Sequence, residues 1–118
     1  MITNYMIIGY GWRADFYYRI AKLLPERFSV CAGVLRTEER AKEVAHKEGV
    51  FATSDLDQAL ERKPDFAVLC VPRDVTKDYL VKLMKKGIPV LCETPPGKNV
   101  EELKELWEMS QKYNGRIQ

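Results

Sequence analysis

The residues best suited to chemistry follow the first apolar run of the chain. Tyr5–Ile8 ends at Gly9, and the chain continues as Gly9-x-Gly11-x-x-Ala14 into a helical stretch. Glycine at the first position permits a sharp turn, and glycine at the second lets a pyrophosphate approach the backbone, while alanine lets the helix lie close to the strand. The start of that helix offers unpaired N–H groups and a positive dipole end to phosphates. The pattern predicts a dinucleotide site, with a glycine-rich turn that binds nothing as the alternative.

The larger side chains of the same turn have less specific roles. We expect Tyr10 and Trp12 to shape the phosphate loop. Arg13 either adds a positive charge to the pyrophosphate site or faces solvent. All three are counted among the predicted cofactor contacts.

Turn and polar residues also follow three later apolar runs. Carboxyl ends of parallel strands meet at one edge of a sheet, so these segments should converge on the glycine turn. Two plainer interpretations stay open: Pro72 as a strand terminator, and the segment from Glu93 to Gly97 as an ordinary strand-to-helix loop. The further predicted cofactor contacts are Arg36, Thr37, Val71, Pro72, Arg73, Glu93 and Pro95.

The segment after the second apolar run bears on the choice of cofactor. NAD-binding domains place an acidic residue there, about 20 residues past the glycines, to accept hydrogen bonds from the ribose. This chain has Leu35-Arg36-Thr37 instead, and its first carboxylate is Glu38. Arg36 can pair with a 2′-phosphate through charge-assisted bonds and stack on adenine, and Thr37 can add a hydroxyl. We therefore favour NADP, with NAD as the alternative if Arg36 is only a solvated loop residue.

Apolar runs and helical spacings alternate along the chain. This alternation predicts an α/β fold, a doubly wound parallel sheet in order 3-2-1-4-5 with helices on both faces, as one three-layer domain over residues 1–118. Residues 116–118 should begin a further strand beside the fifth. The expected strands are Tyr5–Ile8, Phe28–Leu35, Val50–Ala52, Asp65–Val71 and Ile88–Cys92. The expected helices are Asp15–Leu24, Thr37–Glu48, one from Ser54 or Asp55 to Arg62, Val75–Lys86, and Val100–Tyr113 capped by Asn99.

Composition excludes several classes of protein. A formal net charge of +2 argues against nucleic acid as a partner. No apolar run reaches the roughly 20 residues of a membrane helix and no signal peptide precedes the fold, so we expect a cytoplasmic protein without membrane contact. The three cysteines lack metal-ligand spacing and are interpreted as buried reduced thiols, so we expect no metal site. His46, the only histidine, lies in a charged helical stretch and is expected on a solvated face.

These motifs together resemble the N-terminal nucleotide-binding domain of the glucose-fructose oxidoreductase and inositol dehydrogenase (Gfo/Idh/MocA) family. The resemblance covers nearly all of the chain. It lies in the segment 9–14, in Val71-Pro72, and in the block from Gly87 to Pro95, which matches the family's Gly-x-x-Val-x-x-Glu-Lys-Pro pattern and is more specific than the glycines. It implies an NAD- or NADP-dependent oxidoreductase of sugars, cyclitols or related polyols. It also implies a second α/β domain that holds most of the substrate site and the oligomer contacts.

Three departures from the family pattern affect the functional expectation. Thr94 stands where the family has a lysine that is thought to position substrate and assist proton transfer, and a threonine hydroxyl supplies no comparable acid. Thr76 stands where a histidine often follows the Pro72 loop. The chain also ends where the substrate domain should begin, so we expect a fragment that contacts its substrate through a missing C-terminal domain.

We therefore expect the cofactor domain of an oxidoreductase, inactive by itself. Glu93 and Thr94 are the candidate catalytic residues, Thr94 only weakly. The alternative is a non-catalytic dinucleotide-binding sensor or regulatory protein of the same fold.

Overall fold

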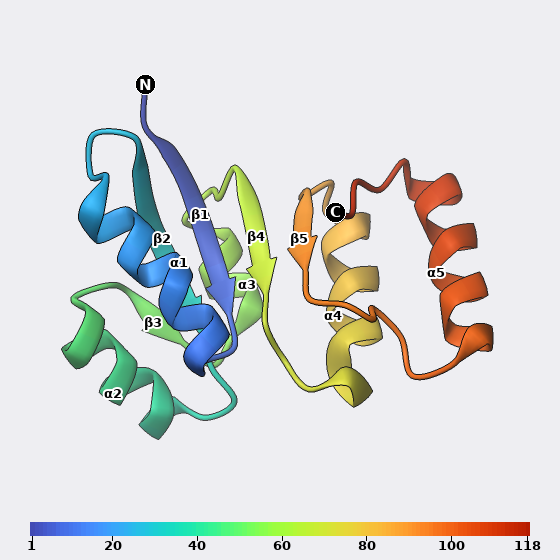
Figure 1. Ribbon diagram of the computed structural model, residues 1–118, viewed down its shortest axis with the longest axis horizontal. Helices are drawn as coiled ribbons and strands as arrows, with labels where there is room; N and C mark the ends of the chain where they lie inside the picture. Colours follow the sequence, from blue (N-terminus) through green and yellow to red (C-terminus); the bar gives the residue numbers. More distant parts are fainter.

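Five parallel strands form one sheet in the order β3-β2-β1-β4-β5 (Figure 1), which confirms the predicted topology. The computed structural model describes residues 1–118. The strands are β1 (Thr3–Ile8), β2 (Phe28–Val34), β3 (Ala52–Thr53), β4 (Phe66–Leu69) and β5 (Val90–Cys92). The helices are α1 (Trp12–Leu23), α2 (Glu38–Glu48), α3 (Leu56–Leu60), α4 (Arg73–Lys85) and α5 (Val100–Tyr113).

The last residues of the chain pair with the outer edge of β5. Ile117 forms a parallel bridge to Val90, and the amide of Val90 donates to the carbonyl of Arg116 at 2.8 Å. The predicted further strand beside the fifth is therefore confirmed as a single bridge. It follows α5, which packs on α4 at the edge of the molecule farthest from β3 (Figure 1).

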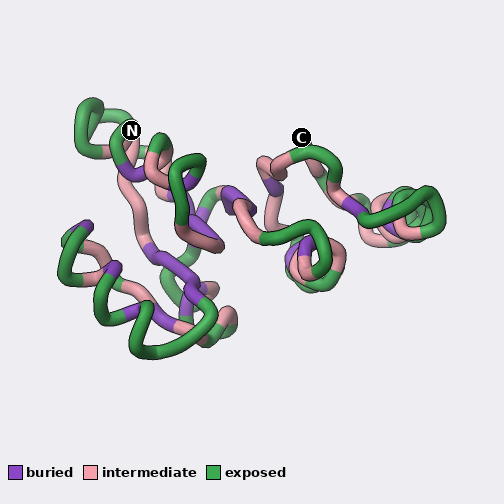
Figure 2. The backbone as a smooth tube through the Cα atoms, turned by 60° about the horizontal axis from the view of Figure 1, so that its bottom comes forward, coloured by how far each residue is buried: buried purple, intermediate pink, exposed green.

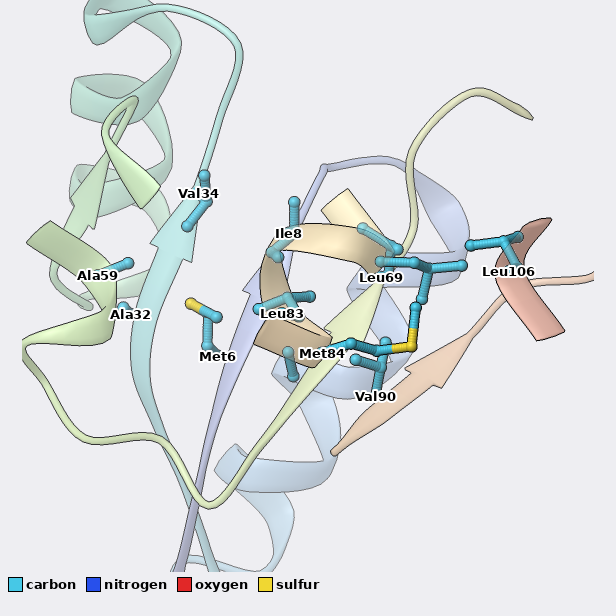
Figure 3. Close-up of a cluster of buried hydrophobic side chains, with 12 residues drawn as sticks. Met6, Ile8, Ala32, Val34, Ala59, Leu69, Leu83, Met84, Val90 and Leu106 are labelled. Carbon is cyan, nitrogen blue, oxygen red and sulfur yellow. The ribbon is translucent and has the colours of Figure 1, made fainter. Parts of the chain in front are cut away.

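The sheet buries a different hydrophobic cluster on each face because successive side chains of a strand point to opposite sides. On one face, Met6 and Ile8 of β1 pack with Leu80, Leu83 and Met84 of α4 (Figure 3). On the other face, the alternate residues of β1 pack with residues of α1 and α2: Tyr5, Ile7, Ala14, Tyr18, Ala41 and Val44. Figure 2 shows the buried segments along the strands and the exposed ones on the outer turns of the helices. None of the helices is long and apolar enough to cross a bilayer.

Side-chain caps fix the starts of three helices where the sequence suggested them. Thr37 accepts from the amide of Arg40 at 3.2 Å, and Asn99 accepts from the amide of Glu102 at 2.9 Å. Asp55, rather than Ser54, caps α3 by accepting from the amide of Asp57. Each cap satisfies a backbone donor that the first turn of a helix leaves unpaired.

Several predicted boundaries were wrong by two or three residues. Strand β3 is Ala52–Thr53 rather than Val50–Ala52, because the ladder with β2 starts only where the amide of Gly33 reaches the carbonyl of Phe51. Helix α1 starts at Trp12 rather than Asp15, because the carbonyl of Gly11 already accepts from the amide of Asp15.

Other strand and helix ends also differ from the prediction. Strand β1 starts at Thr3 rather than Tyr5, because the amide of Thr3 already donates to the carbonyl of Arg27. Helix α4 starts directly after Pro72, which fits proline's preference for the start of a helix, and β5 starts only at Val90. Strand β4 is Phe66–Leu69, shorter than the predicted Asp65–Val71, and β2 ends at Val34. Helix α3 ends at Leu60, before the predicted Arg62.

Helix α1 presents an apolar stripe to solvent. Ala14 and Tyr18 are its buried residues, whereas Phe16, Ile20 and Leu23, from which the helix was predicted, are exposed. Trp12, which is 70% exposed, packs edge-on against Phe16. The small side chain of Ala14 lets α1 lie close to the sheet. The face of α1 that packs on the sheet therefore needs only one large buried side chain, that of Tyr18.

Two buried tyrosines give a matched test of hydrogen bonding in the core. The hydroxyl of Tyr5 donates to the carbonyl of Tyr17, whereas the hydroxyl of Tyr18 has no partner and lies over Gly33. We expect Tyr18→Phe to raise the free energy of unfolding by about 1 kcal/mol, since it removes an unpaired buried polar group, and Tyr5→Phe to lower it by about as much. Urea denaturation of the two variants measures both changes. Equal losses would show that the Tyr18 hydroxyl does have a partner.

Candidate functional site

The glycine turn passes so close to the end of β4 that its first residue has no room for a side chain. A Cβ on Gly9 would lie 2.0 Å from the carbonyl oxygen of Cys70, and the backbone there has a φ of +104°. A Cβ on Gly11 would meet no heavy atom within 4 Å. The first glycine is therefore required by packing within the protein, and the second leaves an open face that a ligand can approach.

The first turn of α1 faces this opening with free backbone donors. Gly11 is the N-cap and contributes no side-chain hydrogen bond, and the first helical bond runs from the amide of Asp15 to the carbonyl of Gly11 at 3.0 Å. The amides that precede Asp15 in the helix have no capping side chain. A pyrophosphate fits such a cradle, because the donors and the dipole of the helix both favour an anion.

A cleft of about 510 Å³ opens beside the turn at the carboxyl ends of the strands. Five of the predicted contacts line it: Gly9, Tyr10, Arg36, Val71 and Pro72. Thr37 follows Arg36 as the cap of α2, and its hydroxyl oxygen is occupied as an acceptor. The other predicted residues lie outside the lining of this cleft: Gly11, Trp12, Arg13, Arg73, Glu93, Thr94 and Pro95.

Three polar residues of the cleft were missed by the sequence analysis: Arg40, Ser54 and Tyr79. Arg40 lies in the first turn of α2, four residues after Arg36, and Ser54 follows the end of β3, so both could have been found from the rule that ligands meet strand ends. Tyr79 could not, because it reaches the cleft from the second turn of α4.

The positive charges around the cleft differ in their partners. The guanidinium of Arg40 pairs with Glu43 at 3.1 Å, whereas Arg36 forms no ion pair. Glu38, the first carboxylate after β2, accepts from the amide of Ser54 at 2.8 Å and from its hydroxyl. These hydrogen bonds hold the pKa of Glu38 below its ordinary value. The corner at the end of β2 thus has one unpaired arginine.

A second group of predicted residues gathers at the end of β5. Nε of Arg13 lies 3.5 Å from a carboxylate oxygen of Glu93, and its guanidinium lies 4.6 Å from the centroid of the Trp12 ring. The structure therefore joins a predicted cofactor residue to a predicted catalytic one. Thr94 is exposed, and the peptide bond between Thr94 and Pro95 is cis.

The two positions at which the chain departs from the family pattern lie in different surroundings. Thr76 is buried, and its hydroxyl donates to the carbonyl of Pro72 at 3.1 Å, so it supports the start of α4. Thr94 makes no side-chain hydrogen bond and remains accessible beside Glu93.

The cysteines at this edge are poor nucleophiles. All three cysteines are free and half-buried rather than fully buried. Burial, followed by the nearby charge of Glu93, raises the pKa of both Cys70 and Cys92 to about 11. The thiols therefore stay protonated near neutral pH. His46 is exposed on α2, as predicted.

Tyr10, the residue between the two glycines, is held from outside the turn. Its hydroxyl donates to a carboxylate oxygen of Glu48 at 2.8 Å, and the other oxygen of Glu48 accepts from Nζ of Lys22 at 2.5 Å. Burial acts to raise the pKa of Glu48, but the hydrogen bonds from Lys22 and Tyr10 outweigh it, and the pKa lies below its ordinary value. Glu48 is therefore a carboxylate at neutral pH.

A larger hollow, of about 780 Å³, lies at the opposite edge of the sheet. It is lined by the first residues of β4 and β5 and by residues 115–118. Ligands of open parallel sheets bind at the carboxyl ends of the strands, so the smaller cleft beside the glycine turn is the better candidate.

Comparison with known proteins agrees with this geometry. The model of an oxidoreductase family with an NAD-binding Rossmann fold matches residues 3–118. The chain belongs to this family. Its five-stranded sheet is the Rossmann fold, and the domain binds NAD(P), as the resemblance to the Gfo/Idh/MocA family implied.

Relatives of this Rossmann domain are longer proteins. The scyllo-inositol 2-dehydrogenase (NADP(+)) IolU of Bacillus subtilis is 34% identical over 118 residues, which are 98% of this chain and 35% of that protein. The D-glucoside 3-dehydrogenase of Escherichia coli is 31% identical over 112 residues, 90% of this chain and 31% of that protein. The chain thus spans about a third of the length of the curated relatives it matches.

Solved structures share the fold of this Rossmann domain at lower identity. The UDP-N-acetylglucosamine 3-dehydrogenase GnnA of Acidithiobacillus ferrooxidans superposes with a TM-score of 0.82 at 22% identity, covering 99% of this chain and 38% of that one. A probable dehydrogenase of Thermotoga maritima superposes with a TM-score of 0.84 at 21% identity, covering 97% and 34%.

The close approach of Gly9 to Cys70 predicts a large loss of stability on substitution. We expect Gly9→Ala to lower the free energy of unfolding by more than about 3 kcal/mol, because the new Cβ overlaps a backbone oxygen that cannot rotate away. Gly49→Ala is the control: it has a positive φ but open space around its Cβ, so it should cost about 1 kcal/mol. Chemical denaturation compares the two, and equal losses would contradict the role given to the Cys70 carbonyl.

Proposed function

We propose that this domain holds the cofactor of an NADP-preferring oxidoreductase acting on a sugar, cyclitol or related polyol. The observation that carries the proposal is the cleft at the carboxyl ends of the strands, with the glycine turn at one side and the unpaired Arg36 at the other. The relatives named for inositol and glucoside dehydrogenation support the substrate class. The nicotinamide supplies hydride transfer, and the protein supplies binding and orientation.

In this proposal the cofactor lies across the edge of the sheet. The free amides of the first turn of α1 and the open backbone at Gly11 receive the pyrophosphate. Arg36 receives the 2′-phosphate, with Arg40 close by in the same cleft. Val71 and Pro72 line the same cleft, and Val71 lies directly beside Gly9.

Arg13 and Glu93 define the other end of the proposed site. Their ion pair directs the Arg13 charge toward Glu93, so a pyrophosphate that recruits Arg13 competes with that carboxylate. We assign Glu93 to positioning rather than to sole catalysis, because this half-exposed carboxylate is already paired with Arg13. Pro95 and Arg73 stay predicted contacts of the cofactor.

We propose that most of the substrate site is contributed by residues outside these 118. The relatives of known activity are about three times longer, and the exposed Thr94 supplies neither the cation nor the acid of the family lysine. The same absence of the lysine at Thr94 supports the alternative function, a non-catalytic dinucleotide-binding sensor of the same fold.

The preference for NADP is tested by titrating both cofactors. We expect NADP to bind more tightly than NAD, and Arg36→Ala to weaken NADP about tenfold or more, because a charge-assisted hydrogen bond contributes about 1.5–3 kcal/mol. NAD affinity should stay within about twofold. Arg62→Ala, which removes an arginine that lies over the Phe51 ring, is the control for loss of charge. Tighter binding of NAD, or an unchanged NADP affinity in Arg36→Ala, would contradict the preference.

The 118-residue chain by itself is expected to turn over no sugar or polyol. Hydride transfer needs a substrate carbon held against the nicotinamide, and an acid or base that contributes about 10²–10⁴ in rate. The assay follows the absorbance of the reduced cofactor with a panel of sugars and cyclitols. Turnover above the uncatalysed rate that disappears in Glu93→Gln would show that this domain carries its own chemistry.

A further inference from the structure

Glu48 is an acidic residue at a place where local physics disfavours one. It is the last residue of α2, where the negative end of the helix dipole repels a carboxylate. Its side chain is only 2% exposed, and burial of a charge is costly unless good partners compensate for it. Because both the helix dipole and burial disfavour a carboxylate here, we look for the role of Glu48 in its two hydrogen-bond partners, Tyr10 and Lys22.

Those partners connect three separate parts of the fold. Tyr10 lies in the glycine turn, Lys22 in the last turn of α1, and Glu48 at the end of α2. The Tyr10 ring also packs at 5.8 Å from the ring of buried Tyr18 and lines the cleft. The residue between the two glycines is thus fixed by its ring on one side and by its hydroxyl on the other.

We propose that Glu48 and Lys22 are positioning residues that hold Tyr10, and through it the turn from Gly9 to Gly11, in the arrangement that receives the pyrophosphate. The inference rests on the proposed function. Glycine has more backbone freedom than any other residue, and the freedom that the two glycines give to this turn must be lost when a ligand binds. The carboxylate removes it beforehand by fixing the one residue of the turn that has a long side chain.

The test compares a ligand that reaches the turn with one that does not. NADP spans the turn and the Arg36 corner, whereas adenosine 2′-monophosphate has no pyrophosphate and needs only the corner. We expect Tyr10→Phe, which keeps the ring and removes the hydroxyl, to weaken NADP about tenfold, as when the competent arrangement falls to about a tenth of the population. Affinity for adenosine 2′-monophosphate should stay within about twofold.

Matched variants separate positioning from general loss of stability. Glu48→Ala should behave as Tyr10→Phe, whereas Glu48→Gln keeps an acceptor for the phenol and should restore most of the NADP affinity. Glu105→Gln breaks the Lys77–Glu105 pair between α4 and α5, far from the turn, and should change neither ligand. Without ligand, amide exchange at Gly9 and Asp15, which donate to the carbonyls of Val34 and Gly11 at the two ends of the turn, should be faster in Tyr10→Phe than in the wild type.

The outcomes distinguish this inference from the function on which it rests. If the wild type binds NADP and Tyr10→Phe weakens both ligands equally, or neither, then the positioning role is wrong and the proposed function stands. Unchanged amide exchange at the turn in Tyr10→Phe would overturn the positioning role in the same way. If the wild type binds neither ligand, the proposed function fails and this inference fails with it.

Discussion

The contact between Gly9 and the carbonyl of Cys70 is the constraint on which the site depends. The amide of Cys70 donates to the carbonyl of Ile8 at 2.8 Å, so β1 and β4 remain paired up to the point where both chains turn away. At that point β1 leads into α1 on one face of the sheet, and β4 leads toward α4 on the other. The cleft opens at this divergence, and a side chain on Gly9 would push the two strands apart where they must be closest.

The strands could be located from sequence because each is a short apolar run followed by a turn residue, and their order followed from the alternation of strands and helices. Their ends could not, because a strand ends where its neighbour stops offering partners, as β3 shows at Phe51 and Thr53. The buried face of α1 also could not be predicted, because it too depends on a neighbouring element. Phe16 and Ile20 have helical spacing, but the closest approach at Ala14 decides which side of the helix meets the sheet.

The residues of the site could be predicted from sequence more easily than the contacts between them. Gly9, Arg36 and Pro72 were found because a strand end marks each of them. The bond from Tyr10 to Glu48 spans 38 residues, and no local pattern of sequence indicates it. The pair of Arg13 and Glu93 likewise joins the end of β1 to the end of β5, which only the folded sheet brings together. Without ligand, Arg13 and Arg40 are each neutralised by an acid, so the free positive charge of the cleft is concentrated at Arg36.

The central position of β1 has a consequence for synthesis of the chain. β1 is made first, yet its amide at Asn4 bonds to Asp65, which lies 61 residues later. At about 5–20 residues per second, a ribosome needs roughly 3–12 s to supply that partner. During this interval Met6, Ile7 and Ile8 have at most β2 beside them, and the edge of β1 that β4 will cover stays open. The strand that organises the finished domain is therefore the one most exposed to mispairing while the domain is being made.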